Sequence, residues 1–496
     1  MKAPRAPLLV LSALSLALAA SSALAADQYI VRVPANVNLV APETPAPPLD
    51  PISVTLSDLA LPAGMVGQPY TFNLANRLTL AGGNGEHNDS EAVWSMKAGD
   101  TLPAGLALSG GTISGTPTIK NTTGTPFEVI ATYKDASGKQ IYTIVVNGAI
   151  LQVTQIAVGA AHTCAITPGG AAKCWGNNQY GNLGDGTKTH SILPKTVKDL
   201  DSGVTHLTTT YNHVCAVHNG GVKCWGSNDK GQLGNNTTTD SSSPVAALGL
   251  ETGVREVHAG YYSTCALLDD GKVKCWGKDN INYDTWKAPL YRPFVSLGGV
   301  ATRLTNGRDL TCAILEGGAA KCWGLNNQGQ MGSIGGDTNT PTQVSGLSSG
   351  VTSISAGHLH ACAVHSGIAK CWGAYQYGKT GTGVSSNDST PRNVLDLSNN
   401  IAGISAGYSH TCAWTQEGAL SCWGYGTDGA LGDGANQHRY RPVLVSGHPD
   451  TVSAVAGTSH TCAISDRGAS CWGNNSVGKL GDGTTTNKNV PVEVQP

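Results

Sequence analysis

The segment CAVHNGGVKC, residues 215–224, places two cysteines on either side of an Asn-Gly pair. Asn-Gly favours the two-residue type I′ turn that closes a β-hairpin. Counting outward from Asn219 and Gly220 places Cys215 directly opposite Cys224. Cα atoms at such cross-strand positions lie roughly 4.5–5.5 Å apart, a separation that a disulfide can bridge. The segment therefore predicts a hairpin closed by a disulfide.

Variants of this segment occur seven times, with first cysteines at 164, 215, 265, 312, 362, 412 and 462. Copies with one more residue between their cysteines have Gly near the turn, which fits a longer loop or a bulge. The predicted pairs are Cys164–Cys174, Cys215–Cys224, Cys265–Cys275, Cys312–Cys322, Cys362–Cys371, Cys412–Cys422 and Cys462–Cys471. A β-rich period near 50 residues predicts a propeller with one small sheet per repeat. The expected fold is all-β, with seven blades and one disulfide per blade.

The first 25 residues are typical of a signal peptide. Lys2 and Arg5 precede the short apolar run LLVLSALSLALAA, and Ala-Leu-Ala at 23–25 forms a small-residue cleavage site. We expect a mature protein that begins at Ala26 and is secreted, extracellular or periplasmic. In such an oxidising compartment, regularly spaced cysteines favour disulfides over metal ligation.

Composition limits the classes of partner. Charged residues make up 13% of the chain and the formal net charge is -2. No basic stripe is present, so we expect no nucleic-acid partner. After the signal peptide, no apolar run is long enough to cross a membrane. We expect a monomer.

A spacer and a second domain precede the repeats. Residues 26–48 are a Pro-rich linker, and residues 49–148 contain β-rich runs at 52–56, 70–74, 92–96, 127–133 and 141–146 without cysteine. Such runs predict a small β-sandwich, with the propeller over 149–496. LPAGLALSGGTISGTPT, residues 102–118, resembles bacterial immunoglobulin-like modules of the cadherin/dystroglycan type, which implies a spacer or an adhesive unit. Trp94 is a candidate core residue, and for Asp135 we favour a turn role over a calcium ligand.

Histidines and tryptophans recur in register with the cysteines. Each of His162, His213, His360, His410 and His460 lies two residues before a cysteine, on the same strand face. A metal site is conceivable, but we favour hydrogen bonds that join one blade to the next. Trp-Gly follows each second cysteine, at Trp175, Trp225, Trp276, Trp323, Trp372, Trp423 and Trp472. Adjacent strand residues face opposite sides, so we expect the disulfide to cover one face of a blade and the indole the other.

These motifs carry a second resemblance. The pattern Gly-x-x-His-Thr-Cys-Ala, followed by Trp-Gly-x-Asn-x-x-Gly-x-Leu-Gly, is similar to the repeats named for the regulator of chromosome condensation. The resemblance covers nearly all of residues 153–496 and implies a seven-bladed propeller of four-stranded blades. We expect the C-terminal VPVEVQP, residues 490–496, to pair beside the N-terminal QVTQIAVG, residues 152–159. The paired cysteines depart from the nuclear and cytosolic members and fit an exported variant.

The third repeat is irregular. After Trp276-Gly277 it lacks the Gly-x-Leu-Gly tail and contains the candidate partner-binding residues Tyr283, Trp286, Tyr291 and Arg292. Loop aromatics beside an arginine have the composition of binding hot spots, although they could instead fill the space of the missing turn. The fourth repeat also lacks its histidine, so we expect a partner site in the sector of these two repeats.

The sequence favours an exported, non-enzymatic binding or adhesion protein that presents propeller loops to a protein or glycan. No nucleophile–base–orienter arrangement is visible, and Asp185, Asp433 and Asp482 recur in register as structural residues would. We expect no catalytic residue, cofactor or metal. The resemblance offers two alternatives, guanine-nucleotide exchange on a small GTPase and inhibition of a hydrolase. Export argues against the first, since such GTPases are cytosolic or nuclear.

Overall fold

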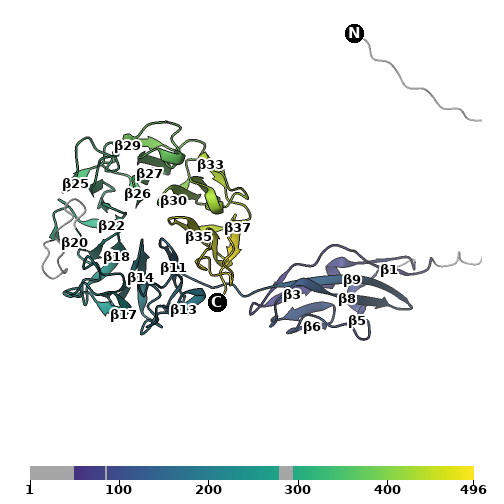
Figure 1. Cartoon of the computed structure of the whole chain (residues 1–496). Helices are drawn as coiled ribbons and strands as arrows, with labels where there is room; N and C mark the ends of the chain where they lie inside the picture. Colours follow the sequence, from purple (N-terminus) through teal and green to yellow (C-terminus); the bar gives the residue numbers. More distant parts are fainter. Residues whose placement is uncertain (1–49, 84–86, 279–293) are drawn as a thin grey trace, which may run out of the picture.

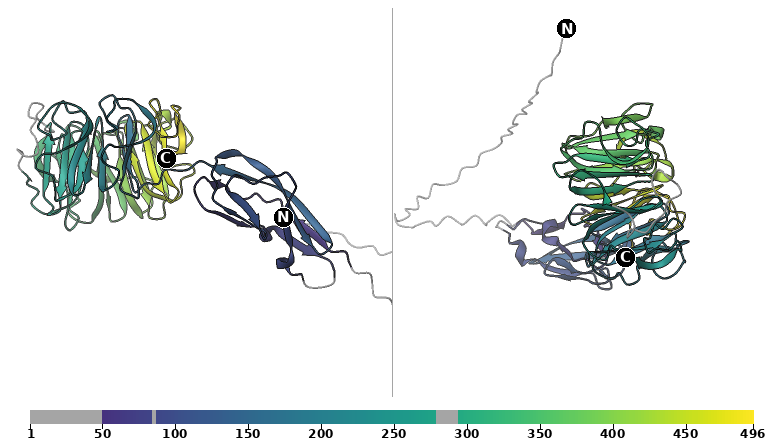
Figure 2. Two further views of the ribbon diagram at one scale, coloured as in Figure 1. Left: turned by 90° about the horizontal axis from the view of Figure 1, so that it is seen from below. Right: turned by 90° about the vertical axis from the view of Figure 1, so that its left-hand side faces the viewer.

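Two β-sheet units follow each other along the chain, a sandwich and a ring of seven sheets (Figures 1 and 2). The structure, a computed structural model, describes residues 50–83, 87–278 and 294–496. The all-β prediction is confirmed, since helical segments within these ranges are single 3₁₀ turns: η1 (Leu74–Arg77), η2 (Asp89–Glu91), η4 (Gln376–Gly378) and η5 (Thr427–Gly429). None of these described helices is long and apolar enough to cross a membrane.

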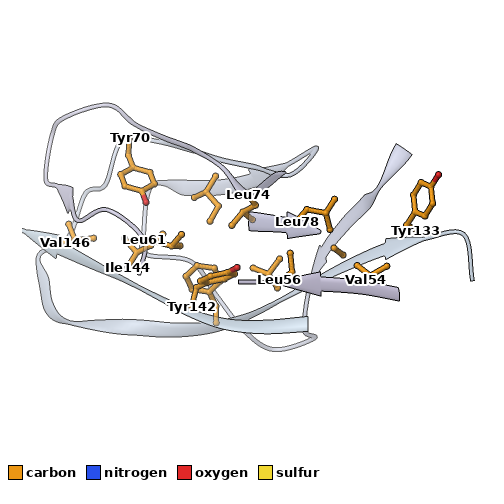
Figure 3. Packing of buried hydrophobic residues seen from close by; sticks show 14 residues of the cluster. Val54, Leu56, Leu61, Tyr70, Leu74, Leu78, Tyr133, Tyr142, Ile144 and Val146 are labelled. Carbon is orange, nitrogen blue, oxygen red and sulfur yellow. The ribbon is translucent and has the colours of Figure 1, made fainter. Parts of the chain in front are cut away.

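The sandwich combines three small sheets, with strand orders β1-β4, β2-β9-β8-β5 and β3-β7-β6. Its strands are β1 (Ser53–Leu56), β2 (Gly64–Met65), β3 (Tyr70–Asn73), β4 (Leu78–Ala81), β5 (Val93–Met96), β6 (Leu106–Ser109), β7 (Thr112–Gly115), β8 (Asn121–Tyr133) and β9 (Ala136–Asn147). Side chains from these sheets and from η1 meet in one buried cluster, which includes Leu74, Ile144 and Val146 (Figure 3). Trp94 is half-buried and packs against this cluster, as a residue at the rim of the core.

The stretch that resembles immunoglobulin-like modules forms the β6–β7 hairpin. Gly110 and Gly111 make its turn with φ values of 54° and 80°, which favour glycine. Asp135 lies with Lys134 in the two-residue turn between β8 and β9. No group of three or more potential metal ligands occurs in the described residues, and we keep the turn role for Asp135.

The ring consists of seven four-stranded antiparallel sheets, which we number blade one to blade seven in chain order. The innermost strands are β10 (Gln155–Val158), β14 (Val204–Thr209), β18 (Val254–Ala259), β22 (Ala301–Asn306), β26 (Val351–Ala356), β30 (Ile401–Ala406) and β34 (Thr451–Ala456). The second strands are β11 (His162–Ile166), β15 (His213–His218), β19 (Ser263–Leu268), β23 (Leu310–Leu315), β27 (His360–His365), β31 (His410–Thr415) and β35 (His460–Ser465).

The two outer strands of each blade follow in chain order. The third strands are β12 (Ala172–Gly176), β16 (Gly221–Gly226), β20 (Val273–Gly277), β24 (Ala320–Gly324), β28 (Ile368–Gly373), β32 (Leu420–Gly424) and β36 (Gly468–Gly473). The outermost strands are β13 (Ser191–Thr196), β17 (Ser241–Ala246), β21 (Phe294–Val295), β25 (Thr338–Gln343), β29 (Asp388–Asn393), β33 (Arg439–Leu444) and β37 (Lys488–Glu493). The chain therefore completes one blade before it begins the next.

Each blade carries one disulfide between its second and third strands, in the seven predicted pairs. In blade two, Asn219 and Gly220 form the turn with φ values of 52° and 78°, as type I′ geometry requires. Hydrogen-bonded and non-hydrogen-bonded pairs alternate outward from the turn, so Cys215 and Cys224 occupy a closer, non-hydrogen-bonded pair. Their Cα atoms lie 4.1 Å apart, nearer than the expected range.

Neighbouring blades pack a disulfide against an indole. Trp225 of blade two lies in one buried cluster with Cys164 and Cys174 of blade one. The same arrangement closes the ring, where Trp175 of blade one packs with the last disulfide, Cys462–Cys471. The prediction that disulfide and tryptophan cover opposite faces of a blade is confirmed, and each blade depends on its neighbour for a core.

The expected strand pairing at the chain ends is wrong. β37 pairs with β36 inside blade seven, and blade one already has four strands of its own. The segment before β10 contacts blade seven without joining its sheet. The Leu151 amide donates a single hydrogen bond to the Val494 carbonyl at 2.8 Å. Packing and single hydrogen bonds, rather than a shared sheet, therefore close this ring.

Candidate functional site

The recurring histidines are structural. Nε2 of each lies 2.7–3.0 Å from a threonine hydroxyl of the next blade, in the pairs His162–Thr209, His213–Thr264, His360–Thr411, His410–Thr461 and His460–Thr163. The threonine hydroxyl in turn donates to a backbone carbonyl, as Thr411 does to Lys379. Since that donation uses the threonine proton, the histidine Nε2–H must donate to the threonine oxygen. The prediction of inter-blade hydrogen bonds is confirmed.

These histidines are held neutral. Burial lowers the pKa of His213 to about 3 and that of His410 to about 4. A protonated ring would carry a second N–H at Nδ1, and among the described residues Nδ1 of His213, His360, His410 and His460 has no hydrogen-bond partner. Each neutral ring therefore uses its single N–H, at Nε2, for the hydrogen bond to the threonine of the next blade.

The mouth of the axial channel carries a different set of side chains. The turn between the first and second strands holds a planar side chain in five successive blades, and we call these five residues the rim arc: Tyr211, Tyr261, Arg308, His358 and Tyr408. Tyr211 and Tyr261 stack with ring centroids 4.1 Å apart, and the Arg308 guanidinium lies 4.9 Å from the Tyr261 centroid. Arg308 donates to Nε2 of His358, whose ring stacks on Tyr408 at 3.9 Å.

Backbone hydrogen bonds fix the rim arc in place. The amide of Tyr261 donates to the Arg308 carbonyl at 3.3 Å, and the amides of His358 and Tyr408 donate to Gly407 and Gly457 at 3.2 and 3.0 Å. The turns of blades three to six are therefore each tied to the turn of the following blade. Blades seven and one carry the smaller Thr458 and Ala160 at the same position, so the arc is open on that side.

Burial and charge tune the groups around the rim arc. Burial and the Arg308 charge lower the pKa of His358 to about 3, which keeps the ring neutral and able to accept a hydrogen bond from the guanidinium. The arc borders a cavity of about 180 Å³ at the channel mouth. A neighbouring pocket of about 330 Å³ is lined by Lys230, Tyr261, Tyr262, Lys278, Arg308 and Asp309. Burial raises the pKa of Asp309 and lowers that of Lys278.

The residues singled out in the sequence fall into two groups, those outside the described residues and those that have a structural role. Tyr283, Trp286, Tyr291 and Arg292 lie outside the described residues, although Lys278, the last described residue before them, lines the pocket beside the arc. The aspartates of the Leu-Gly-Asp-Gly tails accept hydrogen bonds within their own turns, as Asp185 does from the Thr187 amide at 2.9 Å. They are structural, as predicted.

Sequence reasoning missed two features. Asn178, Asn228, Asn326 and Asn475 each organise the loop after the third strand, as in blade one, where the Leu183 amide donates to the Asn178 side chain at 2.8 Å. The rim arc was also missed. Its signal was available, since the residue after Ala-Gly or its equivalent reads Tyr, Tyr, Arg, His and Tyr in repeats two to six.

Comparisons with known proteins agree with this architecture. A family model described as "RCC1-like domain" matches residues 131–455, and one described as "Putative Ig domain" matches residues 39–147. No match was found among curated proteins.

Solved structures give the same fold. Yeast RCC1 (Prp20), solved bound to Kap60, is 22% identical with a TM-score of 0.60, over 70% of this chain and 85% of that one. Human WBSCR16 is 21% identical with a TM-score of 0.57, over 66% of this chain and 94% of its own. A separate structure of Prp20p from Saccharomyces cerevisiae gives 22% identity and a TM-score of 0.59, over 70% and 88% of the two chains. With these seven blades, their inter-blade hydrogen bonds and the match to the family model, the chain belongs to the RCC1-like family of β-propellers.

Proposed function

We propose that this chain is an exported, non-enzymatic binding protein that holds a protein partner against the rim arc. The carrying observation is the continuous stack from Tyr211 to Tyr408 through Arg308. Tyrosine and arginine are the residues that dominate the energetics of protein interfaces. Because the turns are joined by backbone hydrogen bonds, the surface is ordered before binding, which lowers the entropic cost of association.

Location and partner class rest on supporting observations. Seven disulfides fit an oxidising compartment and therefore the predicted signal peptide. Two of the three solved structures concern protein binding: one shows yeast RCC1 bound to Kap60, and another concerns the binding of Prp20p to Gsp1p and histones. At about 22% identity they support a binding scaffold in general, and neither partner is carried over to this chain.

Affinity capture followed by quantitative binding tests the proposal. The mature chain from Ala26 is immobilised and exposed to envelope and extracellular extracts, and a retained protein is purified and titrated against the native chain. Arg308→Ala and Tyr261→Ala each remove the centre of the arc, and we expect a loss of about 2 kcal/mol, roughly thirtyfold in Kd. Tyr440→Ala is the matched control, because Tyr440 is 64% exposed on the outermost strand β33.

Each possible outcome bears on a different part of the proposal. Equal Kd values for the native chain and both arc variants would contradict the site, while retention of a glycan alone would contradict the class of partner. Acceleration of nucleotide release from a small GTPase, or inhibition of a captured hydrolase, would replace simple binding by one of the alternatives. Turnover of a captured partner would contradict the non-enzymatic assignment.

A further inference from the structure

The opposite end of the axial channel contains a second pocket, of about 590 Å³, where the innermost strands begin. We call it the axial pocket. Its volume falls in the roughly 300–1,000 Å³ range of small-molecule sites. The rim arc lies at the other ends of these strands, so the two sites face different openings of the ring. Figure 1 shows the innermost strands around that central axis.

One wall of the axial pocket is polar and charged. The same register position on the innermost strands of blades two, three and four holds His206, Glu256 and Arg303. Glu256 accepts a hydrogen bond from His258 at 3.2 Å and lies 3.7 Å from the Arg303 guanidinium. The Glu256 side chain is 12% exposed, whereas Arg303 is 68% exposed and accessible to a ligand.

The polar wall offers donors and an acceptor with no net charge. Nδ1 of His206 accepts from the Val257 amide at 3.4 Å, so its Nε2–H is the donor available to the pocket. Burial lowers the pKa of His206 to about 3, which keeps this ring neutral. Burial alone would raise the pKa of Glu256, but the His258 hydrogen bond and the Arg303 charge help to lower that pKa below its ordinary value. The ionised carboxylate therefore offsets the charge of Arg303.

The facing wall is small and aromatic. Blades five and six have Ser353 and Gly403 at the register position of the charged residues. Opposite Gly403 on the second strand lies Trp414, where the other blades have Val, Leu or Ile. A Cβ atom on Gly403 would lie 2.1 Å from Cζ2 of Trp414, so the indole covers the glycine and reaches the pocket lining. Two departures from the repeat in one blade therefore act together to place an indole in the channel.

We propose that the axial pocket binds one neutral hexopyranose residue, either as a free sugar or as the end of a glycan. A pyranose ring has an edge of hydroxyl groups and a face of C–H groups, and these match the polar wall and the indole. The paired charges of Glu256 and Arg303 disfavour both a simple anion and a simple cation, each of which would meet a like charge. The polar lining disfavours a purely apolar ligand.

Calorimetry on the mature chain tests this inference. The probes are the methyl glycosides of glucose, galactose, mannose and N-acetylglucosamine, together with their disaccharides, at millimolar concentration. We expect at least one probe to bind. Binding of the methyl glycoside as tightly as its disaccharide assigns a single-residue site, and tighter binding of the disaccharide assigns a glycan end. No binding by any of these probes, or preference for glucuronate or free arginine, would overturn the proposal.

Variants locate the sugar. Gly403→Ser introduces the residue that blades five and seven carry at this position, Ser353 and Ser453, and displaces the Trp414 indole without deleting it. We expect Gly403→Ser and Trp414→Ala to weaken binding roughly tenfold or more, while Trp414→Phe retains most of it. Thermal unfolding confirms that each variant is folded. Tyr261→Ala, in the rim arc, is the control and leaves sugar binding unchanged, so this test fails or succeeds independently of the proposed protein partner. Unchanged affinity in folded Gly403→Ser and Trp414→Ala would refute the site.

Discussion

Two sectors of the same ring join neighbouring blades through different residues. From blade five through blade seven to blade one, the interfaces use His360–Thr411, His410–Thr461 and His460–Thr163, each buried and neutral. Between blades four and five the corresponding residues are Leu310 and Ala361, both fully buried. Donor and acceptor have been replaced together, so no polar atom loses its partner.

Substitutions in the other interfaces follow the same rule. Blade two has Val214 in place of the acceptor threonine, and His162 bonds Thr209 on the neighbouring strand instead. Blade three has Ser263 in place of the histidine, and Asn306 of blade four bonds both Ser263 and Thr311. The pair that joins two blades, which we call a lock, can therefore be polar or apolar, provided that every buried polar group keeps a partner. Blades two to four, where the locks vary, also carry Tyr261 and Arg308 of the rim arc.

Lowering the pH should have the largest effect on stability, because it acts on the interfaces that contain histidine. The five lock histidines have pKa values far below the 6.5 of an unfolded chain, because of burial. The unfolded state therefore binds more protons below pH 6.5, so stability is complete above that pH and is lost as pH falls. We expect up to about 1.4 kcal/mol per pH unit for each histidine, roughly 7 kcal/mol per unit from these five, to which His206 and His358, with pKa values also of about 3, add.

Denaturant unfolding of the propeller between pH 6.5 and 5 measures this slope. Most carboxylates remain ionised in that range, so histidines dominate the change. A midpoint that does not move over these pH values would show that the lock histidines titrate in the folded ring as they do in the unfolded chain. The Leu310–Ala361 interface contributes nothing to the expected slope.

Replacing one of the two residues of a lock should lower the free energy of unfolding by a smaller but measurable amount. His410→Leu removes the Nε2–H that Thr461 accepts at 2.8 Å, and we expect a loss of about 2–3 kcal/mol in the free energy of unfolding. Adding Thr461→Ala recreates the Leu310–Ala361 pair. The Ala430 carbonyl then keeps its Trp472 donor at 3.1 Å. We expect the double variant to recover more than half of the loss, as a double-mutant cycle would reveal. Additive losses would mean that the two residues act separately.

How much of this was visible in the sequence differs between structure and site. The hairpin register of CAVHNGGVKC specified the disulfide pairs, because a two-residue turn leaves one way to pair the strands. Histidine, threonine and tryptophan recur with the same offset from each cysteine, so their shared role could be inferred. Strands β4, β6 and β7 were not predicted, because short runs beside glycine have weak alternation.

The candidate sites were largely hidden for a physical reason. A site residue in a repeat protein departs from the repeat, and a single departure has no periodicity to identify it. Gly403 and Trp414 lie eleven positions apart, and only the pairing of β30 with β31 places them opposite each other. The C-terminal pairing was mispredicted because the sequence shows where blades repeat but not where the chain begins its first blade.

The smallest effect at neutral pH should come from installing a lock where the ring has none. Leu310→His combined with Ala361→Thr supplies a donor and an acceptor at two fully buried positions. The new threonine hydroxyl can donate to the Gln330 carbonyl, which already accepts from Trp372 at 2.9 Å, just as the Thr411 hydroxyl and Trp423 share Lys379. We expect stability at pH 7.5 within about 1 kcal/mol of the native value, since a satisfied polar pair replaces a packed apolar one.

Acid separates this double variant from the native chain. A sixth lock histidine should steepen the pH dependence of unfolding by about 1.4 kcal/mol per unit below pH 6.5. Leu310→His alone is the control, because it buries an imidazole beside Ala361, which has no hydroxyl to accept a hydrogen bond from its N–H. We expect this variant to lose about 1–3 kcal/mol of stability even at pH 7.5. If single and double variants were equally stable, Thr and Ala would be interchangeable opposite a buried histidine. The paired replacement of Leu310 and Ala361 in the native ring would then have no energetic basis.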